Sequence, residues 1–186
     1  FYYYLGAIYL ESGENAKAAD VFSRVVKIAP EDMEAWRGIE ESNFRLEKWE
    51  TAALASERIL ELDPNPRFNP DIILRSGYIF LRAGKLERAE KILLDVYKHA
   101  GNDPAINYYL AVVYSRSNKI EKSAEHFRKA LMAGYREPGT LRDPDIANLR
   151  KSDLFWPIME QYWEGSTGHS AIPESPHSSP TGSSTQ

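Results

Sequence analysis

Residues 15–22 read NAKAADVF, and residues 120–127 read IEKSAEHF. Both segments place a small residue four positions before a phenylalanine, Ala18 before Phe22 and Ser123 before Phe127. The small position recurs between them at Ala52 and Ala89, which gives successive spacings of 34, 37 and 34 residues. A fixed period of this size indicates a repeat architecture, in which one structural unit is stacked several times.

Each copy is predicted to form two helices joined by a turn. Between Tyr2 and Glu11, apolar side chains fall three and four positions apart, which is the spacing of one helical face. A break at Ser12-Gly13 precedes a second helix, over about 15–28. The other predicted pairs are 34–46 with 51–62, 71–83 with 86–99, and 105–117 with 120–133. Gly84 and Asn118 suit the left-handed residue that ends a helix.

The residues around these anchors resemble the tetratricopeptide repeat, whose signature is an aromatic residue, Leu-Gly, Tyr, then Ala, Phe and a closing Pro. The first copy carries nearly the whole pattern, in Tyr2, Leu5, Gly6, Tyr9, Ala18, Phe22 and Pro30. The later copies keep Trp36, Ile39, Ala52 and Pro64, then Gly77, Phe80, Ala89 and Leu93, then Leu110, Ala111, Tyr114, Ser123, Phe127 and Ala130. The resemblance implies an all-α, right-handed superhelical solenoid, the C-terminal part of an array, with four repeats at about 1–32, 33–66, 70–103 and 104–136.

Two places depart from the pattern. Glu40 occupies a small-residue position between packed helices, where a carboxylate needs a partner or a route to water. We expect a local rotation or frayed packing of the second copy there, and a functional carboxylate is the alternative. The segment 63–70 is three residues longer than the other connections, and Pro64, Pro66 and Pro70 forbid helix continuation. We expect an extended bend that slightly re-aims the second half of the solenoid.

Residues 137–164 are predicted to form capping helices, one short and one aromatic. Phe155, Trp156, Tyr162 and Trp163 are expected to cover the core of the fourth repeat, because solenoids need atypical terminal units. The alternative is that these side chains form a partner-binding patch. Sixteen of the 22 residues in 165–186 are Gly, Ser, Thr or Pro, so this segment is predicted to be disordered.

The composition excludes several classes of function. The 186 residues carry a net charge of −4 and no basic stripe, so nucleic acid is not an expected partner. No apolar run approaches the ~20 residues that span a bilayer. The absence of cysteine excludes disulfides and thiolate metal sites, yet it does not separate a cytoplasmic from a periplasmic location. The chain opens at Phe1 in an aromatic run, so we expect that further residues precede it.

No arrangement of residues indicates catalysis. His99, His126, His169 and His177 are far apart in the sequence, and none has a partner three or four residues away that would make a metal pair on a helix. Neither a phosphate-binding glycine loop nor a nucleophile motif is present. We therefore expect no enzyme activity, no cofactor and no metal.

The resemblance implies that the first helix of each repeat lines a concave, peptide-binding face. The candidate groove residues are Tyr3, Arg37, Phe44, Arg45, Leu74, Tyr78, Arg82, Tyr108 and Arg116. Arg45, Arg82 and Arg116 repeat in one slot, and a guanidinium group donates two parallel hydrogen bonds to a carboxylate. The expected partner is therefore a protein segment with apolar anchors and acidic groups. The alternatives are solvated arginines and tyrosines that serve packing between repeats.

The expected function is that of a protein–protein interaction scaffold, and this expectation rests on the family resemblance. A second hypothesis makes the chain an accessory or regulatory domain of a larger enzyme or secretion or assembly machine, whose active part lies upstream of Phe1. A third is self-association through the face that carries residues 1–4.

Overall fold

The computed structural model describes residues 2–63, 70–137 and 139–162. Over these residues the chain is all-α and contains no strand, which confirms the predicted fold class. The first helices of the four repeats are α1 (Tyr2–Glu11), α3 (Met33–Arg45), α5 (Pro70–Arg82) and α7 (Pro104–Arg116). The second helices are α2 (Asn15–Ile28), α4 (Trp49–Leu62), α6 (Leu86–Ala100) and α8 (Ile120–Met132). Two 3-10 turns follow, η2 (Thr140–Arg142) and η3 (Pro144–Ile146), and then α9 (Ala147–Arg150) and α10 (Phe155–Tyr162).

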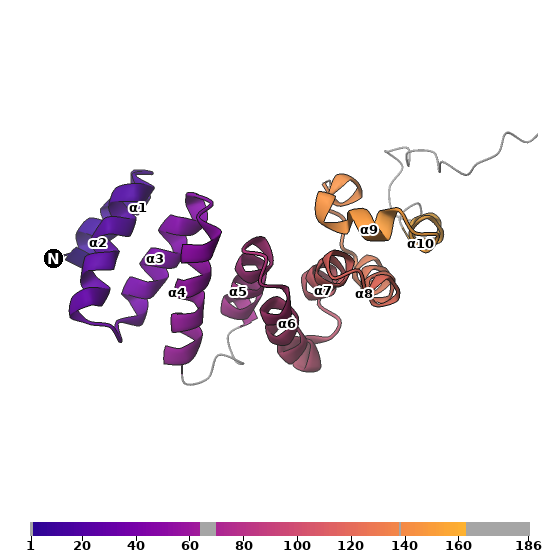
Figure 1. The fold of residues 1–186 in the computed structure, drawn as a ribbon, viewed down its shortest axis with the longest axis horizontal. Coiled ribbons are helices and arrows are strands. Elements are labelled where there is room, and N and C mark those ends of the chain that lie inside the picture. Colours follow the sequence, from indigo (N-terminus) through magenta and orange to yellow (C-terminus); the bar gives the residue numbers. More distant parts are fainter. Residues whose placement is uncertain (1, 64–69, 138, 163–186) are drawn as a thin grey trace, which may run out of the picture.

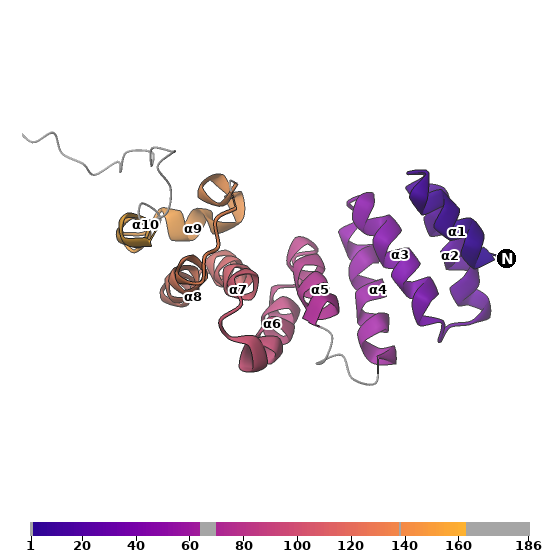
Figure 2. The same cartoon turned by 180° about the vertical axis from the view of Figure 1, so that it is seen from behind.

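The helices stack into an elongated array with α1 and α10 at opposite ends (Figure 1). Each helix packs against the next one along the chain, and first helices also contact each other, α1 with α3 and α5 with α7. The helix axes turn along the array, so that α3 and α4 lie close to the plane of Figure 1 while α7 and α8 are seen nearly end-on. Figure 2 shows the same succession from behind.

The same turn joins the two helices of every repeat. One residue adopts the left-handed conformation, with φ of 78° at Gly13, 55° at Glu47, 74° at Gly84 and 56° at Asn118. The N–H of the following residue then donates to a carbonyl five residues back, at 2.8–2.9 Å, which satisfies the end of the first helix. The prediction for Gly84 and Asn118 is confirmed.

A small residue and a large one meet where the two helices of a repeat cross. They are 16 residues apart in the sequence: Gly6 with Phe22, Gly77 with Leu93, and Ala111 with Phe127. A Cβ atom built on Gly6 would lie 2.7 Å from the Phe22 ring, and one built on Gly77 would lie 2.7 Å from Leu93. Phe22 also packs on the next repeat, because a Cβ on Gly38 would lie 2.5 Å from its ring.

The expectation of rotated or frayed packing at Glu40 is wrong. Helix α3 is continuous through Glu40, whose side chain is buried with 6% exposure. The residue 16 positions later is Ser56. In the second repeat, therefore, the large side chain is on the first helix and the small one is on the second. The Ser56 hydroxyl donates to a Glu40 carboxylate oxygen at 2.5 Å. A longer acidic side chain and a short hydroxyl therefore fill the space that glycine and phenylalanine fill elsewhere.

The helices after α8 pack on the last repeat. Phe155 of α10 is 1% exposed, and its ring stacks on Phe127 of α8 with centroids 5.6 Å apart. Met159 is fully buried beside it, whereas Trp156 is half-buried. The predicted bend at 64–69, Trp163 and the tail 165–186 lie outside the described residues.

The contact of Gly38 with Phe22 leads to a stability prediction. Gly38→Ala is expected to lower the free energy of unfolding by about 1–3 kcal/mol, because the added methyl group collides with a ring that Gly6 already confines. Replacing glycine by alanine at an open helical position would instead raise the free energy of unfolding by up to ~1 kcal/mol. The sign of the change in that free energy therefore distinguishes the two cases. Urea unfolding monitored by circular dichroism measures the difference.

The matched control is Gly139→Ala, since a Cβ there meets no atom within 4 Å and φ is −79°. Its expected effect is within about 0.5 kcal/mol. If Gly38→Ala proves as stable as the parent chain, the close contact does not constrain the packing.

Candidate functional site

Four aromatic side chains form a continuous row across the second, third and fourth repeats, named here the aromatic strip: Phe44, Trp49, Tyr78 and Tyr109. The Tyr78 ring lies at the centre, with centroid distances of 6.0 Å to Phe44, 6.1 Å to Trp49 and 5.6 Å to Tyr109. All four rings are half-buried. Their edges therefore stay accessible while their positions are fixed by packing.

Two arginines of α5 cover one end of the aromatic strip. The Arg75 guanidinium lies 4.5 Å from the centroid of Phe44, and the Arg82 guanidinium lies 4.9 Å from that of Trp49. A cation over a ring face is attracted by the ring quadrupole. Both contacts place a guanidinium group at the Phe44–Trp49 end of the strip, and that of Arg75 is also ion-paired with Glu40 and Glu41.

The three arginines predicted to repeat along the groove, Arg45, Arg82 and Arg116, differ in their contacts. Arg45 donates to the carbonyl of Leu10 at 2.8 Å, and Arg116 donates to that of Leu81 at 2.7 Å. Both carbonyls lie in the last turn of the preceding repeat's first helix, where acceptors lack an intrahelical partner. These two arginines therefore join neighbouring repeats. Arg82, which is exposed over Trp49, differs from them.

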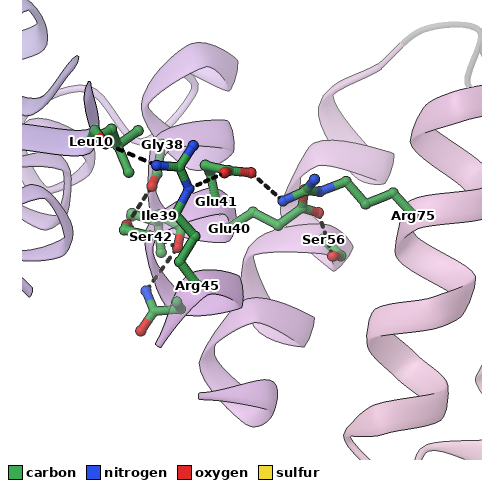
Figure 3. A network of polar contacts seen from close by, with 10 residues as sticks. Leu10, Gly38, Ile39, Glu40, Glu41, Ser42, Arg45, Ser56 and Arg75 are labelled. Atoms are coloured by element: carbon green, nitrogen blue, oxygen red, sulfur yellow. Dashed lines mark hydrogen bonds and ion pairs between the residues drawn. The ribbon is translucent and has the colours of Figure 1, made fainter. Parts of the chain in front are cut away.

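A junction network of polar side chains joins the second repeat to the third (Figure 3). Arg75 of α5 donates from Nε to Glu40 at 2.7 Å and from a terminal nitrogen to Glu41. Glu41 also accepts from Arg45, so the network continues back to the Leu10 carbonyl. Burial by itself raises the pKa of Glu41, but the hydrogen bond from Arg45 and the charge of Arg75 lower it below its ordinary value.

The aromatic strip ends in a hollow of about 420 Å³, named here the end pocket. Helices α5 and α7 form one wall and the segment after α8 forms the other. Its lining comprises Tyr78, Leu81, Arg82, Tyr108, Tyr109, Val112, Tyr135, Glu137, Gly139, Thr140, Arg142, Asp143, Pro144 and Asp145. The segment that caps the solenoid therefore also closes one end of the groove.

Tyr108 was expected on an open groove wall, and the structure buries it instead, with 4% exposure. The Tyr135 ring stacks on the Tyr108 ring at 4.3 Å, and the Tyr108 hydroxyl donates to Asp143. Burial, together with the Asp143 carboxylate, raises the pKa of Tyr108 far above its ordinary value. Packing by the segment after α8 accounts for this tyrosine, so it offers a partner little surface.

The other predicted residues lie apart from the aromatic strip. Tyr3 is 41% exposed and contacts Tyr4 and Phe22 rather than the strip. Arg37 forms an ion pair with Glu34 at 3.6 Å, and Leu74 packs half-buried against the core. The structure thus brings together Phe44, Tyr78 and Arg82 from the predicted set. Any role of these residues in binding remains a prediction.

Sequence reasoning missed Trp49 and Tyr109 in the strip, Arg75 over Phe44, and Tyr135 and Glu137 in the end pocket. Arg75 and Tyr109 are 34 residues apart, so they occupy the same position of successive repeats. Each directly follows a predicted groove residue, Leu74 or Tyr108. The equivalent position holds Gly38 in the second repeat and Tyr4 in the first. Large side chains at this position in three of the four repeats were the available signal.

In the part of the chain that the structure describes, no group of three or more His, Cys, Asp or Glu side chains is arranged to hold a metal ion. Among the same residues, no helix combines the length and apolar character that crossing a bilayer requires.

Two family models of the tetratricopeptide repeat match the chain, at residues 1–32 and 74–138, which together make up just over half of it. The chain belongs to the tetratricopeptide repeat family. As such it is a protein-interaction scaffold in general character.

One similar protein is a chloroplast protein of Arabidopsis thaliana, which is 34% identical over 105 residues. The match covers 53% of this chain and 31% of the Arabidopsis protein, so it spans about a third of the length of that relative.

Solved structures share the fold. A MamA structure superposes with a TM-score of 0.66 at 16% identity, covering 92% of this chain and 96% of that one. MamA from Desulfovibrio magneticus RS-1 gives 0.64 at 20% identity, covering 89% and 96%. YrrB, described as a tetratricopeptide repeat protein with an unusual peptide-binding site, gives 0.65 at 12% identity, covering 90% and 86%.

The junction network leads to a second stability prediction. Arg75→Met is expected to lower the free energy of unfolding by about 2 kcal/mol, because it leaves the buried Glu40 carboxylate without its cation. Chemical unfolding measures the loss. The control is Arg24→Met, which removes an exposed pair with Asp20 and should change stability by less than about 0.5 kcal/mol. Equal losses in the two variants would contradict the special role of the network.

A pH dependence follows from Glu41. Its folded-state pKa is lowered, so its contribution to stability is complete above the ordinary glutamate value of 4.5 and is lost as the pH falls through the lowered pKa. The parent chain should therefore lose stability below about pH 4.5 more steeply than Arg45→Met, which removes one cause of the lowered pKa. Thermal unfolding between pH 7 and pH 3 measures this difference, and identical profiles would refute it.

Proposed function

We propose that the chain binds a segment of a partner protein along the aromatic strip, in the groove that the first helices line. The observation that carries this proposal is the continuity of the strip over three repeats. Half-buried rings in fixed positions present large apolar contact areas at little cost in conformational entropy, and such residues are enriched where binding energy concentrates. The end pocket adds a concave site at the end of the same surface.

The charge along the strip supports an acidic group on the partner close to Trp49. Arg82 is exposed there and is not committed to a backbone carbonyl, unlike Arg45 and Arg116. Its guanidinium can therefore donate to a carboxylate. The partner's apolar side chains would contact Phe44 and Tyr78. YrrB supports this use of the fold, since a peptide-binding site is attributed to that protein.

A second candidate function is that of an accessory domain within a larger protein. The observation that favours it is the length of the Arabidopsis relative, of which the matched region forms 31%. In that case the groove holds a segment that the larger protein must recruit. Self-association stays a prediction, and the exposed side chains Tyr4, at 73%, and Ile8, at 58%, lie on the face where it would occur.

The experiment compares partner capture from host lysate by the parent chain and by Arg82→Glu. We expect the variant to lose at least about tenfold in affinity for a groove-bound partner, because it replaces an attractive charge by a repulsive one at the surface of the strip. Tyr78→Ala should show a comparable loss. Circular dichroism must first show that helicity and thermal unfolding are preserved.

The matched control is Arg24→Glu, which reverses an exposed arginine on the second helix of the first repeat, away from the strip. It should capture the partner as the parent does. If all three variants retain the same proteins, the partner binds elsewhere and the groove assignment is wrong.

A further inference from the structure

The end pocket has a different charge from the rest of the aromatic strip. Its lining includes the carboxylates Glu137, Asp143 and Asp145 and the guanidinium groups of Arg82 and Arg142. The Arg82 guanidinium also lies over the Trp49 ring, at 4.9 Å from its centroid. Asp145 is compensated by Arg116 at 3.7 Å. Of the remaining lining charges, Asp143 accepts from the Tyr108 hydroxyl, Arg142 is a cation, and Glu137 is the carboxylate whose charge acts on both Tyr109 and Tyr135.

Burial and carboxylate charge raise the pKa of tyrosine side chains that line the pocket. Burial raises the pKa of Tyr109, and the charges of Tyr78, Glu137 and Asp103 raise it further. The pKa of Tyr135 is raised in the same way, through burial first and then through Tyr109 and Glu137. Burial is the main cause of both pKa shifts, and the Glu137 carboxylate adds to both because a negative charge near a phenol opposes its ionisation.

The aromatic strip is occupied by cations only over part of its length. Arg75 covers Phe44 and Arg82 covers Trp49, but among the described residues no lysine or arginine lies over Tyr78 or Tyr109. The two uncovered rings are 5.6 Å apart and tilted by 46°. Both rings line the end pocket, as does Glu137. Two ring surfaces beside a carboxylate form the kind of site that recognises an organic cation.

We propose that the end pocket takes the side chain of a lysine or arginine of the bound partner segment, with its cation between the Tyr78 and Tyr109 rings and the Glu137 carboxylate. The aliphatic stem of such a side chain would lie along Leu81 and Val112, which also line the pocket. This inference rests on the proposed function, because the cation belongs to the segment that the groove binds.

The proposal gives the groove a direction. The Arg82 guanidinium, which lies over Trp49 and also lines the end pocket, attracts a carboxylate on the Trp49 side, and the Glu137 carboxylate attracts a cation beside Tyr109. A segment that carries an acidic residue and then a basic one fits in one orientation only, because the reverse orientation places like charges together.

The test is an NMR titration of the full chain with N-acetyl-lysine N-methylamide as the probe. The matched probes are the norleucine analogue, which has the stem without the charge, and N-acetyl-glutamate N-methylamide. We expect the lysine probe alone to shift the ring resonances of Tyr78 and Tyr109. Glu137→Gln should weaken its affinity about fivefold, in line with a partly exposed ion pair combined with a cation–π contact.

The control variant is Glu121→Gln, which removes an exposed carboxylate at the start of α8, outside the pocket. It should leave the affinity unchanged. Equal shifts from the norleucine probe, stronger shifts from the glutamate probe, or an unchanged affinity in Glu137→Gln would each overturn the proposal. Any of these results, combined with partner capture that still depends on Arg82, would leave the proposed function intact, so the two failures are distinguishable.

Discussion

The structure depends on how much side-chain volume fits where the two helices of a repeat cross. In a close-packed interior that space accommodates one large side chain, so its opposite position must be small. In the pairs Gly6 with Phe22 and Ala111 with Phe127, the small residue is on the first helix and the large one on the second. In the pair Glu40 with Ser56 the order is reversed. Because the second helix of one repeat supports the first helix of the next, the alignment of the groove side chains follows from this condition.

Satisfying that condition with a glutamate has a further effect, because a buried carboxylate requires a cation. Arg75 supplies it from the third repeat, and its guanidinium also covers Phe44 in the aromatic strip. One arginine therefore serves both the packing of the junction and the surface of the groove. Between the second helices, Arg88 of α6 binds Glu57 of α4 through two hydrogen bonds of 2.8 and 2.6 Å. The second and third repeats are thus joined by arginine–carboxylate pairs through both their first and their second helices.

The periodicity of Ala18, Ala52, Ala89 and Ser123 was enough to predict the helices and the family, because these residues are all fully buried in the same crossing. It could not predict how Glu40 is accommodated, since its partners come from positions 16 and 35 residues away and the 34-residue pattern says nothing of their pairing. Tyr78 and Arg82 occupy the repeat positions predicted to line the groove, so the sequence identified them. Tyr109 lies one position outside that set, so the sequence did not identify it. Tyr108 fitted its slot, but the segment after α8, which lies outside the repeats, covers it. The candidate site was therefore predictable where it follows the repeat and unpredictable where side chains of different repeats, or of the cap, meet.

The buried apolar residues form two separate clusters rather than one. Ala18, Phe22, Ala35, Ile39 and Ala55 belong to the first, and the core that runs from Ala52 through the cap forms the second. The boundary runs through the second repeat, since Ile39 and Ala55 belong to the first cluster while Ala52 and Ala53 of the same repeat belong to the second. Apolar contacts are insensitive to ionic strength, whereas partly exposed ion pairs weaken as salt screens them. In a linear array whose cooperativity is transmitted between neighbours, the coupling of the two halves therefore varies with the ionic composition of the surrounding solution. The ion-paired part of this coupling is expected to weaken as the salt concentration rises, while the apolar contacts that Ala52 and Ala53 share with the third repeat persist.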